Sequence, residues 1–181
     1  PHIQKINERF IFNDEELSDD NLSKLLIEVE NANNGEQITY FEILTAAYFY
    51  HASKFKDKIN IIESGLFHRF DATNIIDNNL SSIVTSIGLD HLDWLPKNEQ
   101  NIEKIVYEKT SSLLNSSIVV SKQSSDETLN LIKKTINNNH SKKIIYKDDF
   151  NYSLSENGFI YYEDEYGGLK LPKPNLLGNF Q

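Results

Sequence analysis

The chain has 181 residues, and its 18 Lys and Arg stand against 27 Asp and Glu, which gives a formal net charge of -9. This length is typical of one domain with a sizeable apolar core. The acidic balance disfavours nucleic acid as a partner, because nucleic-acid-binding surfaces are basic. The sequence shows neither a signal peptide nor an apolar run of the ~18 residues that a membrane-spanning helix needs. It contains no Cys, which excludes disulfides and thiolate metal sites. We therefore expect a globular, cytoplasmic protein without a membrane partner.

The N-terminal part predicts a short extended segment followed by two helices. Residues 8–12 alternate in character, as strand residues do. Ser18 is a good N-cap for a helix over residues 19–31, in which leucines recur at helical spacing. Thr39 and Glu42 have the spacing of a capping box, in which each side chain pairs with the backbone amide of the other residue. We therefore expect a second helix directly after Thr39.

The rest of the chain predicts strands that alternate with helices. Short runs rich in Ile and Val indicate four strands of a buried sheet, at residues 59–62, 82–87, 117–120 and 144–146. Two helical patterns, at residues 99–114 and 125–138, separate the later strands, and such alternation predicts a parallel sheet. Residues 159–162 and 169–171 predict an antiparallel hairpin. The expected fold class is therefore α/β, with a mostly parallel sheet and an antiparallel hairpin tail.

Polar residues follow the first two predicted strands. Glu63 comes directly after the first strand, and Asp90 and His91 follow the second. Ligands of parallel sheets collect beyond the carboxyl ends of the strands, where these residues could hold a divalent cation. Mostly oxygen ligands favour Mg²⁺, completed by water and substrate phosphates. The spacing alone leaves open that Glu63 caps a helix or pairs with a Lys, and that His91 is a surface residue.

One of the two arginines of the chain, Arg69, lies in the loop after Glu63. Its guanidinium could clamp a carboxylate or a phosphate with two hydrogen bonds. The alternative is a polar loop in which Arg69 pairs with Asp71. His68 follows Phe67, which favours packing of the imidazole over ligation.

Three motifs in this order carry a family resemblance. They read TYFE at Thr39–Glu42, ESGLFHRFDATN at Glu63–Asn74 and TSIGLDH at Thr85–His91. The opening PHIQKINERF and the closing LPKPNLLGNFQ add two further matching segments, so that the resemblance spans nearly the whole chain. The sequence resembles the bifunctional dihydrofolate synthase/folylpolyglutamate synthase family, which belongs to the Mur ligase superfamily.

This resemblance implies an ATP-dependent ligase that joins L-glutamate to dihydropteroate or to a folate. ATP phosphorylates the carboxyl group of the pterin substrate, and the amine of glutamate then displaces the phosphate. The family's metal-binding residues fall on Glu63 and His91, which implies Mg²⁺. Its lysine that is often carbamylated falls on Lys109, for which the alternative is an exposed helical cation.

The resemblance also assigns residues on the substrate side. Phe41, Asp71 and Ala72 align with the family's contacts to the pterin, and Arg69 occupies the arginine position of the second motif. The chain also departs from the family pattern. Phe67 and His68 stand where the family has two glycines, and a longer side chain there would crowd the backbone approach. Thr110 and Ser111 replace an Ala-Gly pair after Lys109, and Phe180 stands where the family usually has His.

Two family elements are missing from the sequence. It contains no G-x-x-G-K-[ST] phosphate-binding loop and no C-terminal glutamate-binding domain. We therefore expect residues 1–181 to form an incomplete Mur-ligase-like central (ATPase) domain that lacks the P-loop strand and helix and is inactive alone. A complementary P-loop or C-terminal fragment would then be a partner, beside ATP, L-glutamate and the pterin or folate. The alternative is a non-catalytic remnant of a split or decaying gene that at most binds a folate or a partner.

Overall fold

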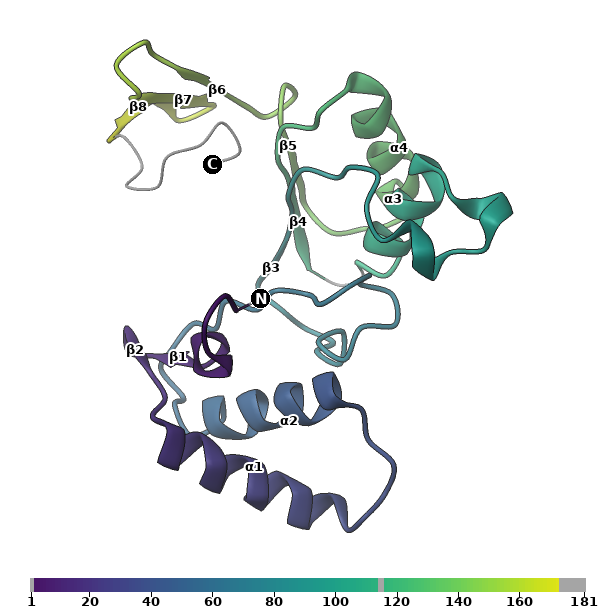
Figure 1. Ribbon diagram of the computed structural model, residues 1–181. Helices are drawn as coiled ribbons and strands as arrows, with labels where there is room; N and C mark the ends of the chain where they lie inside the picture. Colours follow the sequence, from purple (N-terminus) through teal and green to yellow (C-terminus); the bar gives the residue numbers. More distant parts are fainter. Residues whose placement is uncertain (1, 114–115, 173–181) are drawn as a thin grey trace. The chain divides into compact units, whose positions relative to one another are not determined.

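The computed structural model describes residues 2–113 and 116–172 (Figure 1). The chain divides into two compact units, Pro1–Ile75 and Ile76–Gln181. Each unit has its own secondary structure. The predicted tail motif at residues 171–181, including Phe180, lies almost entirely outside the described residues.

The N-terminal unit is built from a small hairpin and two helices. Its elements are η1 (Ile6–Arg9), β1 (Ile11–Phe12), β2 (Glu15–Glu16), α1 (Asp19–Asn33) and α2 (Tyr40–Ala52). The predicted extended segment is therefore helical in its first part and a strand only at β1. The two turn residues between β1 and β2, Asn13 and Asp14, have φ of 53° and 67°. Asn and Asp tolerate this left-handed conformation, which a two-residue hairpin turn requires.

Both predicted helix starts are confirmed. The hydroxyl of Ser18 accepts a hydrogen bond from the amide of Asn21 at 3.4 Å at the start of α1. At α2, the hydroxyl of Thr39 accepts from the amide of Glu42 at 3.2 Å, and the carboxylate of Glu42 accepts from the amide of Thr39 at 2.8 Å. The two helices run side by side (Figure 1). They enclose a core whose fully covered members are Phe10, Leu22, Leu25, Leu44 and Ala47.

The strand predicted at residues 59–62 is absent, and that prediction is wrong. The segment has no regular secondary structure, and the side chains of Ile59 and Ile61 are 80% and 93% exposed. A strand is stable only when its backbone groups pair with a neighbouring strand. No described strand pairs with this segment, so its Ile-rich composition alone does not make it a strand.

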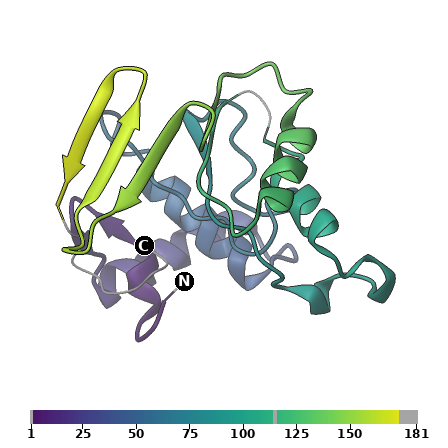
Figure 2. The ribbon, with the colours of Figure 1, turned by 90° about the horizontal axis from the view of Figure 1, so that it is seen from above.

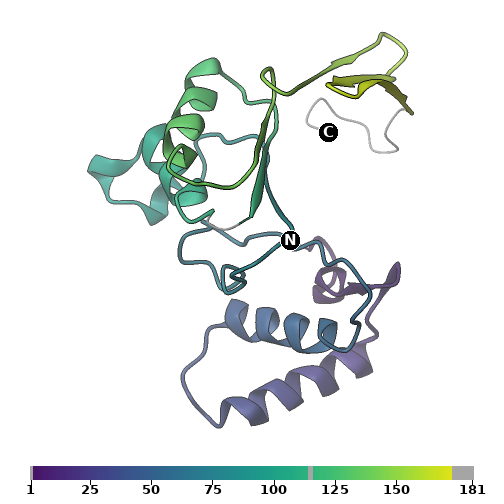
Figure 3. The ribbon, with the colours of Figure 1, turned by 180° about the vertical axis from the view of Figure 1, so that it is seen from behind.

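The C-terminal unit contains the predicted parallel sheet. Strands β3 (Ser81–Val84), β4 (Ser117–Val120) and β5 (Lys143–Ile145) lie in the order β3-β4-β5 and are parallel. Val84, Val120 and Ile145 are paired in register and buried, so they form one row of the core. Helices α3 (Ile102–Thr110) and α4 (Asp126–Ile136) pack together beside the sheet (Figure 3). Two short helices, η2 (Leu92–Trp94) and η3 (Lys97–Glu99), lie between β3 and α3.

An antiparallel sheet of three strands follows β5. It consists of β6 (Phe150–Leu154), β7 (Ile160–Asp164) and β8 (Gly167–Leu171), which lie side by side in Figure 2. The predicted hairpin corresponds to β7 and β8, whereas β6 was not predicted. An aromatic contact links the end of β5 to the antiparallel sheet: the ring centroids of Tyr146, which follows β5, and Tyr152, in β6, lie 5.3 Å apart.

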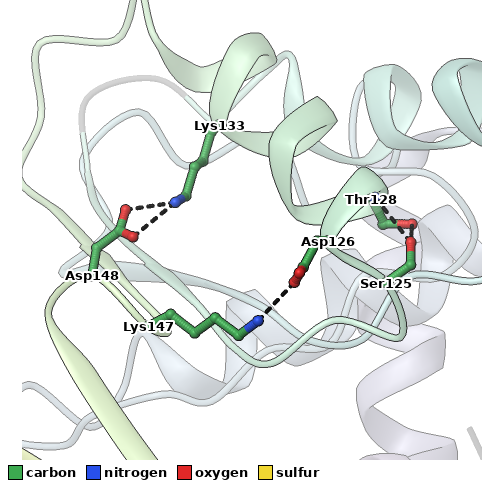
Figure 4. Close-up of polar contacts among 6 residues, drawn as sticks. All are labelled: Ser125, Asp126, Thr128, Lys133, Lys147 and Asp148. Atoms are coloured by element: carbon green, nitrogen blue, oxygen red, sulfur yellow. Dashed lines mark hydrogen bonds and ion pairs between the residues drawn. The ribbon is translucent and has the colours of Figure 1, made fainter.

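Two ion pairs connect α4 to the loop after β5 (Figure 4). Nζ of Lys133 lies 2.6 Å from a carboxylate oxygen of Asp148, and Nζ of Lys147 lies 2.8 Å from one of Asp126. Lys147 has φ of 72°, an uncommon value for a residue with a side chain. Exposed pairs contribute ~0–1 kcal/mol each, so they orient the loop more than they stabilise the unit.

Candidate functional site

A cavity of about 250 Å³ lies in the N-terminal unit. Its walls come from the segment before β1, from α2 and from the segment after α2, and two of the predicted site residues, Phe41 and Glu63, line it. The lining is mostly aromatic and aliphatic, with three charged side chains: Glu8, Arg9 and Glu63. This combination suits a flat, largely apolar group that carries a polar or anionic end.

Asp71 organises the loop that forms one wall of this cavity. Its Oδ2 accepts hydrogen bonds from the amides of Gly65 at 2.9 Å and Leu66 at 3.4 Å. Its Oδ1 accepts from the amide of Thr73 at 2.9 Å and from the hydroxyl of Thr73 at 2.5 Å. Both carboxylate oxygens therefore serve the loop itself, which fixes the backbone beside Phe41.

The other predicted substrate residues of this loop lie close to Asp71 in sequence. The guanidinium carbon of Arg69 lies 4.1 Å from the centre of the Phe70 ring, a cation–π contact. Burial lowers the pKa of the His68 imidazole below its ordinary value, and the charge of Asp71 opposes this shift. His68 is therefore favoured as a neutral, packed side chain, as the sequence suggested. Ala72 is half-buried.

Arg9 is a cavity residue that the sequence did not assign to the site. It lines the cavity, and its Nε donates a hydrogen bond to Nδ1 of His2 at 2.8 Å. The neighbouring carboxylate of Glu8 accepts from the amides of residues 3–5, which lowers its pKa from 4.5 to about 2. The sequence signal for Arg9 is its place in the opening segment PHIQKINERF, which matches the family pattern.

A second cluster, in the C-terminal unit, joins Asp90, His91 and Lys109. Oδ2 of Asp90 lies 3.4 Å from Nζ of Lys109 and 3.8 Å from Nε2 of His91. Lys109 belongs to the last turn of α3, whereas Asp90 and His91 follow β3. Two predicted site residues, His91 and Lys109, thus meet at one carboxylate.

His91 is held in an unusual backbone conformation. Its φ is 54°, in the left-handed region that residues with a side chain rarely adopt. Such a conformation costs ~1–3 kcal/mol and persists only where the surrounding structure enforces it. The segment around His91 must therefore be anchored on both sides.

The sequence placed Glu63 and His91 at the ends of neighbouring parallel strands. Glu63 follows no strand, because residues 59–62 are not one, and it belongs to the N-terminal unit. His91 does lie beyond the carboxyl end of β3. Among residues 2–113 and 116–172, no three His, Asp or Glu side chains gather at a common metal position.

In the same described part of the chain, no helix is long and apolar enough to cross a membrane.

Two curated synthases are similar to this chain in sequence. The curated dihydrofolate synthase/folylpolyglutamate synthase of Escherichia coli (strain K12) is 35% identical over 102 residues, which are 56% of this chain and 24% of that protein. The enzyme of the same name from Bacillus subtilis (strain 168) is 34% identical over 140 residues, which are 74% of this chain and 32% of that protein. This chain matches a fragment of the proteins of the dihydrofolate synthase/folylpolyglutamate synthase family. No protein-family model matches it.

Solved structures of this synthase family share the fold. E. coli FolC in complex with DHPP and ADP matches 99% of this chain with a TM-score of 0.82 and 27% identity. The bifunctional folylpolyglutamate synthase/dihydrofolate synthase of Yersinia pestis, complexed with AMPPNP and a Mn ion, matches 98% with a TM-score of 0.82 and 28% identity. The match covers 42% of each of those chains. The chain thus spans less than half the length of these synthases.

Proposed function

We propose that this chain is the central part of an ATP-dependent ligase that adds L-glutamate to dihydropteroate or to a folate. The observation that carries the proposal is the cavity in the N-terminal unit, which residues of the Thr39–Glu42 and Glu63–Asn74 motifs line. A relative bound to DHPP and ADP supports the same substrate classes.

The cavity is large enough to bind one part of the substrate. Its volume of about 250 Å³ is below the ~300–1,000 Å³ of pockets that enclose a whole ligand. It therefore suits one ring system of a pterin or folate, packed on Phe41 within a wall that Asp71 and Ala72 shape. Arg69 lies in the same loop and remains the candidate for an anionic group of the substrate.

The phosphate side of the reaction is assigned to the second cluster. Asp90 and His91 offer neighbouring oxygen and nitrogen donors, which fit part of the shell of a hard cation such as Mg²⁺. His91 and a carbamylated Lys109 would contribute ligands to the ion, which when bound would neutralise charge on the phosphate oxygens of ATP, and Glu63 is kept as a candidate of the N-terminal cavity. The protein's own residues then position the carboxyl group of the substrate and the γ-phosphate for transfer.

Unmodified Lys109 is a cation paired with Asp90. A carbamate on Lys109 would set two anions against each other, so we propose that the carbamate forms only when a divalent cation lies between them. The test is ¹³C NMR with labelled bicarbonate, with and without Mg²⁺. We expect a carbamate signal that requires Mg²⁺, is lost in Lys109→Arg and survives in Lys104→Arg. A signal that is independent of Mg²⁺ would contradict this reasoning.

The chain alone is expected to be inactive. The sequence contains no G-x-x-G-K-[ST] loop, and losing a single preorganised donor to a transition state already costs ~10²–10³ in rate. We therefore propose that turnover needs a phosphate-binding loop from another polypeptide segment.

The decisive experiment measures ADP release with Mg²⁺, ATP, L-glutamate and dihydropteroate or a reduced folate. We expect release only when a polypeptide that carries a phosphate-binding loop is added, and loss of that release in Glu63→Ala but not in the exposed control Glu36→Ala. Folate binding that never leads to ADP release would favour the alternative, a non-catalytic binding module. Turnover by the chain alone would show that the missing loop is dispensable.

A further inference from the structure

We infer that Gln123 is a positioning residue that fixes the segment carrying His91. This inference rests on the proposed function, in which His91 acts on the phosphate side of the site. Gln123 follows β4 and is only 8% exposed. No motif in the sequence pointed to it.

The side chain of Gln123 makes three hydrogen bonds to backbone groups. Its Nε2 donates to the carbonyl of Thr85 at 3.1 Å and to the carbonyl of Ser121 at 2.9 Å. Its Oε1 accepts from the amide of Ile87 at 2.9 Å. Both N–H groups of the amide and its oxygen are therefore used. The bonds to Thr85 and Ile87 link the segment after β4 to the segment after β3, whereas the bond to Ser121 holds the side chain against its own segment.

The hydrogen bonds of Gln123 continue the connection between the two chain segments beyond the end of the β3–β4 ladder. The parallel ladder between β3 and β4 stops at Val84, and the amide of Ser121 donates to the carbonyl of Val84 at 2.9 Å just beyond it. From Thr85 onward, one buried side chain does what ladder hydrogen bonds do within the sheet. The TSIGLDH motif therefore starts from a fixed point.

A second glutamine holds the far side of the same segment. Nε2 of Gln100 donates to the carbonyl of Leu92 at 2.9 Å and to that of Leu95 at 3.2 Å. His91, with its φ of 54°, lies between the two anchored stretches. Because Gln100 is exposed, its contribution is smaller than that of buried Gln123.

Release of the Gln123 contact has a defined consequence. The segment can then relax toward ordinary backbone conformations, which turns the imidazole of His91 away from Asp90 and Lys109. Residues that orient a metal ligand without touching the metal typically change metal affinity by ~10–100-fold. Gln123 is argued to act in this way, through His91.

The test uses Gln123→Met, which keeps the length of the side chain and removes its hydrogen bonds, with Gln37→Met at an exposed position as the control. Mn²⁺ serves as the probe, and broadening of the His91 ring signals in NMR reports its binding. We expect Gln123→Met to shift the His91 signals and to weaken the Mn²⁺ effect by about 10–100-fold. The signals of α3 and α4 should stay unchanged, and Gln37→Met should match the wild type.

Unchanged His91 signals in a folded Gln123→Met variant would overturn the inference. If the wild type shows no Mn²⁺ effect while Gln123→Met still shifts His91, positioning is supported and the metal role in the proposed function fails. A measurement on the wild type covers the case in which the variant does not fold. Fast hydrogen exchange of the Ile87 amide, equal to that of an unbonded amide, would overturn the inference without any variant.

Discussion

Replacing Gly65 with alanine tests how tightly the loop organised by Asp71 packs on the cavity wall. A Cβ at this position would lie 2.8 and 2.9 Å from two ring carbons of Phe41 and 3.0 Å from Oδ2 of Asp71. Carbon atoms pack best at ~3.5–4.0 Å, so the Phe41 ring must retreat by about 0.7 Å or the loop must shift. The loop resists because Asp71 holds it through four hydrogen bonds to Gly65, Leu66 and Thr73. Overpacking of this kind costs ~1–3 kcal/mol.

The assay is urea unfolding of the N-terminal unit, followed through the amide NMR signals of α2. With a slope of ~2 kcal/mol per M, we expect the midpoint of Gly65→Ala to fall by about 0.5–1.5 M. Glu36→Ala is the control, because Glu36 is an exposed residue of the same unit. Its free energy of unfolding should stay within ~0.5 kcal/mol of the wild type. Equal midpoints for the two variants would refute the argument that Gly65 is a close-packing position.

Three further outcomes are expected. Ile132 in α4 is 0% exposed, so Ile132→Ala should lower the free energy of unfolding by ~2–5 kcal/mol. Urea unfolding of the C-terminal unit measures this change. The pKa of Glu8 is lowered from 4.5 to about 2, with the amide of Ile3 as the largest cause, so the stabilisation by its carboxylate is present above pH ~4.5 and lost as the pH falls toward 2. The protection of the amides of residues 3–5 from hydrogen exchange, taken relative to the intrinsic rate at each pH, should fall over that range, and in Glu8→Gln it should be low at every pH. Ile83 is 69% exposed on β3, at the edge of the parallel sheet, so light scattering should detect self-association that Ile83→Lys reduces.

The features that the sequence predicted well are those that depend on near neighbours along the chain. The N-cap at Ser18 and the capping box of Thr39 and Glu42 need only residues three positions apart, and both form as predicted. The strand predicted at residues 117–120 also forms, and the strand predicted at residues 144–146 forms at Lys143–Ile145. Their pairing partners are distant in sequence, but their β-branched runs suit a buried parallel sheet.

Features that depend on a distant partner were predicted less well. Residues 59–62 have the composition of a strand, but composition does not supply the neighbour whose backbone groups a strand needs. The reverse holds for β6 (Phe150–Leu154), which is too polar to suggest a strand yet pairs with β7 along its whole length. Pairing, rather than propensity, decides both cases.

The residues of the candidate sites also divide into those that the sequence predicted and those that it did not. The sequence assigned Phe41, Glu63, His91 and Lys109, whose chemistry is visible in the residue type. Phe41 and Glu63 line one cavity, and His91 and Lys109 meet at Asp90. The anchoring side chain of Gln123 could not be inferred, because its role depends on which backbone carbonyls and amides lie within reach after folding.

Some motif residues use their polar groups to hold the backbone of the motif in place. Asp71 is a motif residue whose carboxylate is occupied by its own loop, and Thr85 and Ile87 are motif residues whose backbone groups pair with Gln123. Such positions set the backbone path of the motif within their own unit. Replacements at such positions therefore act by changing the path of the loop and not by removing a reacting group. We expect Phe67→Gly, which gives the glycine of the family pattern, to change the path of the loop that Asp71 organises and to leave the Asp90–Lys109 pair, in the other unit, as it is.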